Sequence, residues 1–206
     1  MTASEAGPRR ERWDAKHGAR DPLDARAPDP MAVAVAGATA PGRALDLAAG
    51  VGRHGVWLAT QGWTATLVDF SGVALERAKA AADRAGVSVS LIRADLTQYQ
   101  PEPRSADLVL VMFLHIPLEE RRLVYANAAA AVAPGGRLLI VGHDRSNLGR
   151  DVPGPQDPAV VYTAEEVAAD IPGLVLEDVH RRLRYLDDGR QTADAVVVAR
   201  RPAETA

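Results

Sequence analysis

The sequence contains no cysteine, so it has neither a disulfide framework nor thiolate chemistry, as is usual in a reducing cytoplasm. No apolar run approaches the roughly 20 residues of a membrane helix, and the polar start lacks the apolar core of a signal peptide. The net charge is −3, without a basic excess, and aromatic residues make up only 4% of the chain. We therefore expect a soluble, cytoplasmic protein whose partners include neither a membrane nor a nucleic acid.

Length and composition fit one globular domain with a short appendage. The chain has 206 residues, of which 47% are apolar, enough for a full core. We expect residues 1–42 to form an N-terminal cap segment and helix, and residues 43–206 to form the main domain. Residues 1–12 are polar and are expected to be frayed, whereas Asp29 and Pro30 predict the start of a helix from Met31 to about Thr39.

The most informative stretch runs from Arg43 to Leu58. Residues 44–48 predict a buried strand, Gly50 and Gly52 a tight turn, and Gly55 the start of a helix that packs back on the strand. Such a corner presents backbone N–H groups and the positive end of a helix to a ligand, and its two glycines place no Cβ in the way. The stretch therefore predicts a nucleotide-binding corner.

Two kinds of nucleotide fit this corner. The run 50–55 satisfies the dinucleotide fingerprint Gly-x-Gly-x-x-Gly, and Asp69 follows at the spacing of a ribose-binding acid. Asp46, four residues before Gly50, favours another ligand, because a carboxylate beside the turn repels a pyrophosphate and attracts an ammonium group. A ligand that carries an amino acid and a sulfonium suits the corner better than one that carries two phosphates.

The pattern acid-x-x-x-Gly-x-Gly resembles the first motif of class I S-adenosylmethionine-dependent methyltransferases. Together with Trp13-Asp14, it is most similar to the small bacterial methyltransferases of the tellurite-resistance and thiopurine type. The resemblance implies that Arg53 pairs with the carboxylate of the cofactor, and that Trp13 either roofs the pocket or only holds the N-terminal segment on the core. It implies S-adenosyl-L-methionine as the cofactor, S-adenosyl-L-homocysteine as the product, and no metal site.

Further acidic residues follow the next strands. Asp69 ends a strand predicted at 63–68, where a carboxylate can accept both ribose hydroxyl protons; its alternative role, as the cap of the next helix, competes with Ser71. Phe70 packs either on the adenine or in the core. A third strand, predicted at 87–93, ends in Ala94-Asp95-Leu96, where the resemblance implies that the Asp side chain binds the exocyclic amine of adenine. The expected cofactor-binding residues are thus Trp13, Asp46, Ala48, Gly50, Gly52, Arg53, Asp69, Phe70, Ala94, Asp95, Leu96 and Met112.

The second half of the chain predicts the rest of the sheet. Residues 106–113 are nearly all apolar, as in a central parallel strand; a helix at 117–132, a break at 134–136 and a strand at 137–141 follow. Two last strands, around the turn Asp188-Gly189, predict an antiparallel hairpin. The expected fold is therefore α/β: a doubly wound, mostly parallel seven-stranded sheet with helices on both faces and a C-terminal antiparallel hairpin. Arginines near the hairpin favour a solvated sheet edge over an anion site: Arg181, Arg182, Arg184, Arg200 and Arg201.

Methyl transfer is an in-line displacement, for which a protein supplies mainly alignment and the exclusion of water. If a general base acts, His115 and His143 are the candidates because each follows a strand end; the alternative is that each only packs or braces a loop. Asp144 either orients His143 or caps a turn. The segment 145–162 has no apolar period and is expected to be a lid.

The expected function is methyl transfer from S-adenosylmethionine to a small-molecule oxygen, nitrogen, sulfur or metalloid nucleophile, by a monomer or homodimer. An NAD(P)-dependent oxidoreductase uses the same glycines but leaves Asp46, Asp95 and the hairpin without a role. A catalytically silent cofactor-binding protein is the other alternative, and it needs no acceptor pocket.

Overall fold

The computed structural model describes residues 3–19 and 27–204. The chain divides into two compact units, Met1–Gln100 and Pro101–Ala206. Within the described ranges, no helix combines the length and the apolar character needed to cross a membrane.

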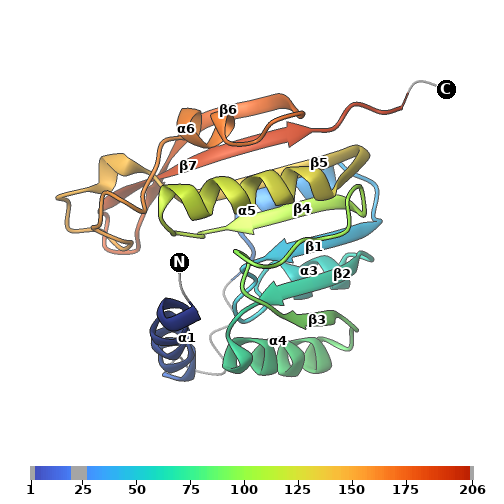
Figure 1. Cartoon of the computed structure of the whole chain (residues 1–206), viewed down its shortest axis with the longest axis horizontal. Helices are drawn as coiled ribbons and strands as arrows, with labels where there is room; N and C mark the ends of the chain where they lie inside the picture. Colours follow the sequence, from blue (N-terminus) through green and yellow to red (C-terminus); the bar gives the residue numbers. More distant parts are fainter. Residues whose placement is uncertain (1–2, 20–26, 205–206) are drawn as a thin grey trace. The chain divides into compact units, whose positions relative to one another are not determined.

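The first unit contains a three-stranded parallel sheet (Figure 1). Strand β2 lies between β1 and β3, with Leu45 beside Thr66 and Leu67 beside Leu91. Helices α3 and α4 both pack on β2, and α1 lies beside α4. The elements are α1 Ala3–Gly18, α2 Pro30–Gly37, β1 Arg43–Leu47, α3 Gly55–Thr60, β2 Thr64–Asp69, α4 Gly72–Ala85 and β3 Ser90–Arg93.

The helix ends in this unit follow from local sequence. The Asp29 side chain accepts a hydrogen bond from the Met31 N–H (2.9 Å), and Pro30 occupies the first turn of α2, as expected. Ser71 caps α4 by accepting from the Ala74 N–H (3.1 Å), and Gly86 closes the helix at φ 67°. Local caps therefore fix where α2 and α4 begin.

The expectation of a frayed N-terminal segment is wrong for its described part, because Ala3–Gly18 forms helix α1. Two polar contacts hold α1 beside α4. The Ser71 hydroxyl hydrogen-bonds to Asp14 Oδ1, and Arg77 Nη2 donates to the Gly18 carbonyl (3.1 Å). A polar segment with a low intrinsic tendency to order is thus anchored by tertiary contacts.

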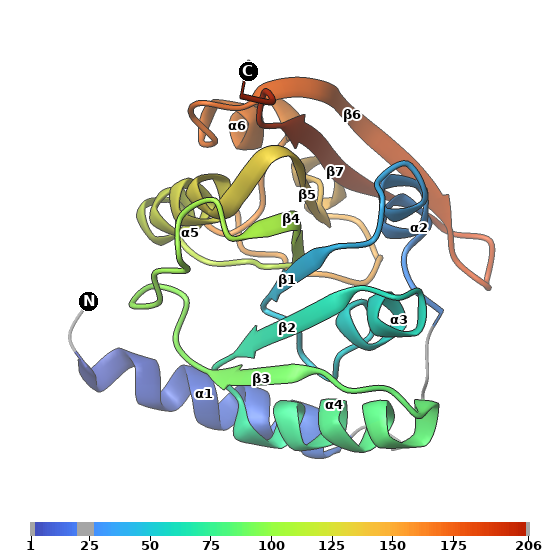
Figure 2. The same ribbon diagram turned by 90° about the vertical axis from the view of Figure 1, so that its right-hand side faces the viewer.

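The second unit contains parallel strands β4 and β5, followed by antiparallel β7 and β6 (Figure 2). Leu108, Leu110 and Val111 of β4 are fully buried, as expected for a central strand. Helix α5 packs on β4 and β5, and α6 packs on β6 and β7. The elements are β4 Ala106–Met112, α5 Leu118–Ala131, β5 Val132–His143, the short 3₁₀ helix η1 Arg145–Asn147, α6 Ala164–Ala169, β6 Val175–Tyr185 and β7 Gln191–Arg200.

The strands form a seven-stranded, mostly parallel sheet in the order β3-β2-β1-β4-β5-β7-β6. The expected α/β fold with a C-terminal antiparallel hairpin is therefore confirmed. The hairpin turn lies at the predicted place, since Leu186 N–H donates to the Arg190 carbonyl (2.8 Å) and Gly189 has φ 82°.

Strand β5 begins earlier than predicted, at Val132 instead of 137. Gly135 donates its N–H to the Arg201 carbonyl (3.0 Å), and the Arg201 N–H donates to the Gly136 carbonyl (3.0 Å). A Cβ on Gly136 would lie 2.9 Å from the Asp107 carbonyl oxygen, so backbone segments meet closely here. Gly136 thus allows this close approach from within β5, and the helix already ends at Ala131.

Arg181 is exposed, as expected for a solvated sheet edge, but three of the other arginines near the hairpin turn inward. Arg182 and Arg184 both bind the fully buried carboxylate of Asp194. Arg201 donates to the carbonyls of Ala129 (2.8 Å) and Val132 (2.7 Å) at the end of α5. These three side chains satisfy buried acceptors, a role that the charge pattern alone did not reveal.

Candidate active site

The corner between β1 and α3 adopts a left-handed backbone at three alternate residues: Ala48 (φ 60°), Gly50 (φ 55°) and Gly52 (φ 81°). The turn is closed by the Gly52 N–H, which donates to the Ala49 carbonyl (3.0 Å). Gly50 and Gly52 suit such a backbone, whereas Ala48 adopts it at a cost of about 1 kcal/mol. The chain thus tolerates strain at the end of β1.

The glycines of the corner have different tasks. A Cβ on Gly52 would lie 2.9 Å from the Ala78 Cβ, and one on Gly55 would lie 2.6 Å from Leu67 Cγ. These two glycines let α3, α4 and β2 pack closely. We expected Gly52 to clear space for a ligand, but the atoms around it belong to the packed core. Gly50 is different, because a Cβ there would meet only His17 Cε1, at 3.5 Å.

Asp46 lies under the corner and is 1% exposed. Its Oδ2 accepts a hydrogen bond from the Gly55 N–H (2.9 Å), and its Oδ1 has no hydrogen-bond partner among the described residues. Burial raises the pKa of Asp46 to about 7; the Gly55 N–H lowers it, and the charge of Asp69 raises it. Within the described part of the chain, the Gly55 N–H is the hydrogen-bond donor to this carboxylate, and no ion pair stabilises its charge.

Asp69 organises the same corner from the end of β2. Its Oδ2 accepts from the Gly50 N–H (2.8 Å) and its Oδ1 from the Ser71 N–H (2.9 Å). Burial raises its pKa, while these N–H groups lower it and the nearby Asp14 raises it. Ser71, and not Asp69, caps α4 through its side chain. Each Asp69 oxygen has a second lone pair, which suits a pair of ligand hydroxyls.

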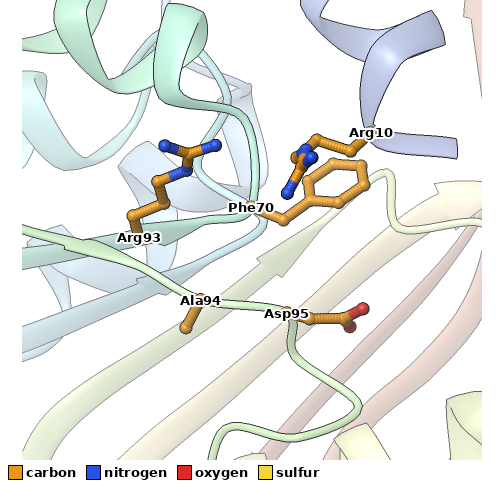
Figure 3. A pocket seen from close by; sticks show the side chains of 5 residues that line it. All are labelled: Arg10, Phe70, Arg93, Ala94 and Asp95. Atoms are coloured by element: carbon orange, nitrogen blue, oxygen red, sulfur yellow. The ribbon is translucent and has the colours of Figure 1, made fainter. Parts of the chain in front are cut away.

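A cavity of about 210 Å³ lies beyond the ends of β2 and β3 (Figure 3). Asp95 Oδ1 accepts from the N–H and the hydroxyl of Thr97 (both 2.9 Å), so this carboxylate is fixed by a turn. Leu96 is buried and does not line the cavity. The cavity is lined by Arg10, Phe70, Arg93, Ala94 and Asp95. The structure thus brings together Phe70, Ala94 and Asp95 of the predicted set.

Helix α1 reaches the corner through His17, a residue that the sequence analysis did not select. His17 is 6% exposed, and Trp13 stacks on it with ring centres 5.5 Å apart. The spacing of four residues, which places both rings on one helix face, was the available signal. Trp13 is half-buried, and the residues that line the cavity do not include it.

The two residues after Gly52 have structural partners. Arg53 Nε donates to the Ala27 carbonyl (2.6 Å), so part of its guanidinium already binds the chain. Burial lowers the pKa of His54 to about 4, and Arg53 lowers it further while Asp29 opposes the shift. His54 is therefore neutral at pH 7.

The second unit places the two candidate bases together. His115 Nε2 accepts a hydrogen bond from the backbone N–H of His143 (3.0 Å), and the two rings stack with centres 5.1 Å apart. Tyr162 also stacks on His115, at 5.7 Å, and Phe113 lies 5.3 Å from His143. Because the Nε2 lone pair of His115 is committed to an amide, His143 is the better placed of the two as a base.

Three further positions lie close to His143 in the sequence or in space: Asp144, the end of β4, and Gly154. Asp144 Oδ1 accepts from the Ser146 N–H (2.9 Å) and caps η1, so it serves as a turn cap. Met112 is 6% exposed at the end of β4, and the following Phe113 has φ 59°. A Cβ on Gly154 would lie 2.8 Å from His143 Cγ, so the segment after η1 packs directly on the imidazole.

Comparison with known proteins agrees with this geometry. Residues 44–136, which contain the corner, match the family described as "Methyltransferase domain". Residues 44–136 are thus similar to a methyltransferase domain. The match agrees with the expected class of enzyme and with S-adenosyl-L-methionine as its cofactor, whereas a search of curated protein sequences gave no significant match.

Solved structures share the fold of this chain. A structure titled "Conversion of a Disulfide Bond into a Thioacetal Group during Echinomycin Biosynthesis" has 21% identity and a TM-score of 0.75, covering 96% of this chain and 94% of that one. The N-methyltransferase NodS of Bradyrhizobium japonicum WM9, in complex with S-adenosyl-L-homocysteine, has 18% identity and a TM-score of 0.73, with coverages of 94% and 98%.

TehB of Haemophilus influenzae has 19% identity and a TM-score of 0.70; the match covers 84% of this chain and 62% of TehB. The chain therefore spans less than two thirds of TehB. The family match over residues 44–136 agrees with the predicted resemblance to methyltransferases, and TehB and NodS share the fold of this chain.

Proposed function

We propose that this protein transfers the methyl group of S-adenosyl-L-methionine to a small-molecule nucleophile, and that the cofactor binds at the corner between β1 and α3. The observation that carries the proposal is the buried Asp46 carboxylate, whose Oδ1 has no hydrogen-bond partner among the described residues. Buried polar atoms normally have a partner, so a ligand donor suits this place.

The charge of the ligand decides between the alternatives. An ammonium group beside Asp46 stabilises the ionised carboxylate. It offsets the desolvation free energy that raises the pKa of Asp46 to about 7. A pyrophosphate would add negative charge near two buried acids, Asp46 and Asp69, and would raise that cost. The amino-acid end of S-adenosylmethionine therefore fits better than a dinucleotide.

The remaining parts of the cofactor have matching groups in the same unit. Asp69 offers two carboxylate oxygens, fixed by backbone N–H groups, to the ribose hydroxyls. Phe70, Ala94 and Asp95 line a cavity in which the Phe70 ring can pack on adenine and Asp95 can accept from the exocyclic amine. Arg53 and Trp13 are proposed to contact the amino-acid end, with His17 beside them.

The methyl group is supplied by the sulfonium of the bound cofactor, so the protein has to align the acceptor and exclude water. The proposed acceptors are small molecules with an oxygen, nitrogen, sulfur or metalloid nucleophile. Where the acceptor must lose a proton, His143 is the proposed base, and His115 holds its backbone N–H.

Calorimetry with S-adenosylhomocysteine tests the proposal. The wild-type protein should bind this product, and Asp69→Ala should bind it roughly tenfold more weakly or worse, because hydrogen bonds to a charged group are lost. Asp83→Ala, which removes an exposed carboxylate paired with Lys79, is the matched control and should bind normally. Binding of NADH without binding of S-adenosylhomocysteine would overturn the proposal in favour of an oxidoreductase.

A further inference from the structure

Three strands of the second unit place charged side chains in a row on one face of the sheet. His143 of β5 is the cross-strand partner of Asp194 in β7, and Asp194 is the partner of Arg182 in β6. Asp194 is 0% exposed, although it lies between an imidazole and two guanidinium groups. Directly opposite residues on adjacent strands face the same side and interact.

We infer that Asp194 is a positioning residue, which holds His143 in the tautomer that carries its proton on Nδ1. His143 Nδ1 is buried and lies 3.8 Å from Asp194 Oδ1, which is a charge contact and is longer than a hydrogen bond. A carboxylate attracts an N–H in this place and repels a nitrogen lone pair, so it favours a proton on Nδ1 and leaves the lone pair on Nε2. The inference rests on the proposed function, in which His143 Nε2 takes a proton from the acceptor.

The two arginines fix the direction of the carboxylate. Arg184 binds it with two nitrogens, Nε to Oδ2 (2.5 Å) and Nη2 to Oδ1 (3.0 Å), and Arg182 Nη2 donates to Oδ2 (2.7 Å). A guanidinium that binds both oxygens prevents the carboxylate from rotating. The same contacts satisfy the oxygens of a fully buried carboxylate, whose burial without partners would be costly.

Other contacts hold His143 as well. The backbone N–H of His143 donates to His115 Nε2 (3.0 Å), and the stacked His115 ring covers one face of the His143 imidazole. Gly154 approaches the ring so closely that a Cβ would lie 2.8 Å from Cδ2. These contacts restrain the orientation of the ring. The choice between a proton on Nδ1 and a proton on Nε2 is then left to the charges around it.

The chemical consequence concerns one proton. When an acceptor O–H or N–H is methylated, its proton moves to Nε2 of the neutral imidazole, which becomes an imidazolium, and it later passes to solvent. A ring with the proton on Nε2 could not accept it there. Asp194 is thus expected to act through His143 and not by touching the acceptor.

Nitrogen-15 NMR of the histidine rings tests the inference without any acceptor. The chain has 5 histidines, and the variant His143→Gln identifies the His143 signals by their loss. We expect the neutral His143 ring to be protonated on Nδ1 in the wild-type protein and to shift toward the Nε2-protonated form in Asp194→Asn. The matched control is Asp178→Asn, because Asp178 Oδ1 lies 2.8 Å from Nδ1 of the exposed His180 and should affect only that ring.

Two results would overturn the inference: a wild-type His143 with its proton on Nε2, or an unchanged tautomer in a folded Asp194→Asn protein. The wild-type spectrum decides even where the variant fails to fold. Calorimetry with S-adenosylhomocysteine on the same samples keeps the two proposals apart, because absent binding refutes the proposed function while the tautomer remains measurable.

Discussion

Asp46→Asn is expected to stabilise the free protein at pH 8 and, at the same time, to weaken its binding of S-adenosylhomocysteine. Asp46 is 1% exposed and its pKa is raised from 3.8 to about 7, mainly by burial. Between these two pH values the folded protein holds a proton that the unfolded chain has lost. Raising the pH through this window therefore favours the unfolded state.

The size of the effect follows from the pKa difference. One pKa unit corresponds to about 1.4 kcal/mol, so a rise from 3.8 to about 7 removes at most about 4 kcal/mol of stability from the wild-type protein. Above pH 7 the loss is complete and the curve becomes level. The amide of the Asp46→Asn variant has no proton to lose, so the advantage of the variant should grow from pH 4 to pH 7 and then stay constant.

Urea unfolding at several pH values, followed by the fluorescence of the 3 tryptophans, measures this difference. Asp83→Asn is the control because Asp83 is exposed on α4, and its curve should run parallel to that of the wild type. A gap between Asp46→Asn and wild type that does not change with pH would refute the argument from burial.

The affinity for S-adenosylhomocysteine is expected to change with pH in the opposite direction to the stability. An ammonium group needs the ionised carboxylate, so wild-type affinity for S-adenosylhomocysteine should rise about tenfold per pH unit below pH 7 and then level off. Asp46→Asn should bind weakly and with little dependence on pH. A wild-type affinity that is constant from pH 5 to pH 8 would show that Asp46 does not meet the ammonium group.

Three further substitutions test the packing. Ala48→Gly should raise the free energy of unfolding by up to about 1 kcal/mol, because Ala48 has φ 60°; a lower value in urea unfolding would contradict the assigned strain. Gly55→Ala should lower stability by about 1–3 kcal/mol, because its methyl group would lie 2.6 Å from Leu67 Cγ; an unchanged melting temperature would show that this contact yields freely. Asp170→Ala should lower the free energy of unfolding by about 3–5 kcal/mol, because it leaves the buried Arg121 side chain, 4% exposed, without its carboxylate. Thermal unfolding measures this loss, and a value below about 1 kcal/mol would be inconsistent with a buried ion pair.

The predictable parts of the fold are those that local sequence determines. Ser71 and Gly86 mark the ends of α4 because a side-chain cap and a left-handed glycine act within a few residues. The capping box of Thr163 and Glu166 likewise starts α6 from within four residues. Apolar runs and turn residues supply the strands, and their order follows from the family resemblance.

The unpredicted features depend on contacts between distant parts of the chain. Nothing in the local sequence indicates that Gly52 meets Ala78, or that Arg182 and Arg184 turn toward Asp194. The acids at the strand ends were found because a parallel sheet brings such ends to one edge. His17 was missed because its role depends on where α1 lies.

The contact between Gly154 and His143 links two positions that are separated along the chain. A side chain at 154 would start 2.8 Å from the imidazole and would require a backbone of φ 127°, which glycine alone adopts readily. During evolution, the imidazole therefore excludes a side chain at position 154 for as long as His143 is kept. Descendants of this gene that replace the histidine lose this contact but keep the same backbone, so we expect the glycine to persist after the histidine is gone.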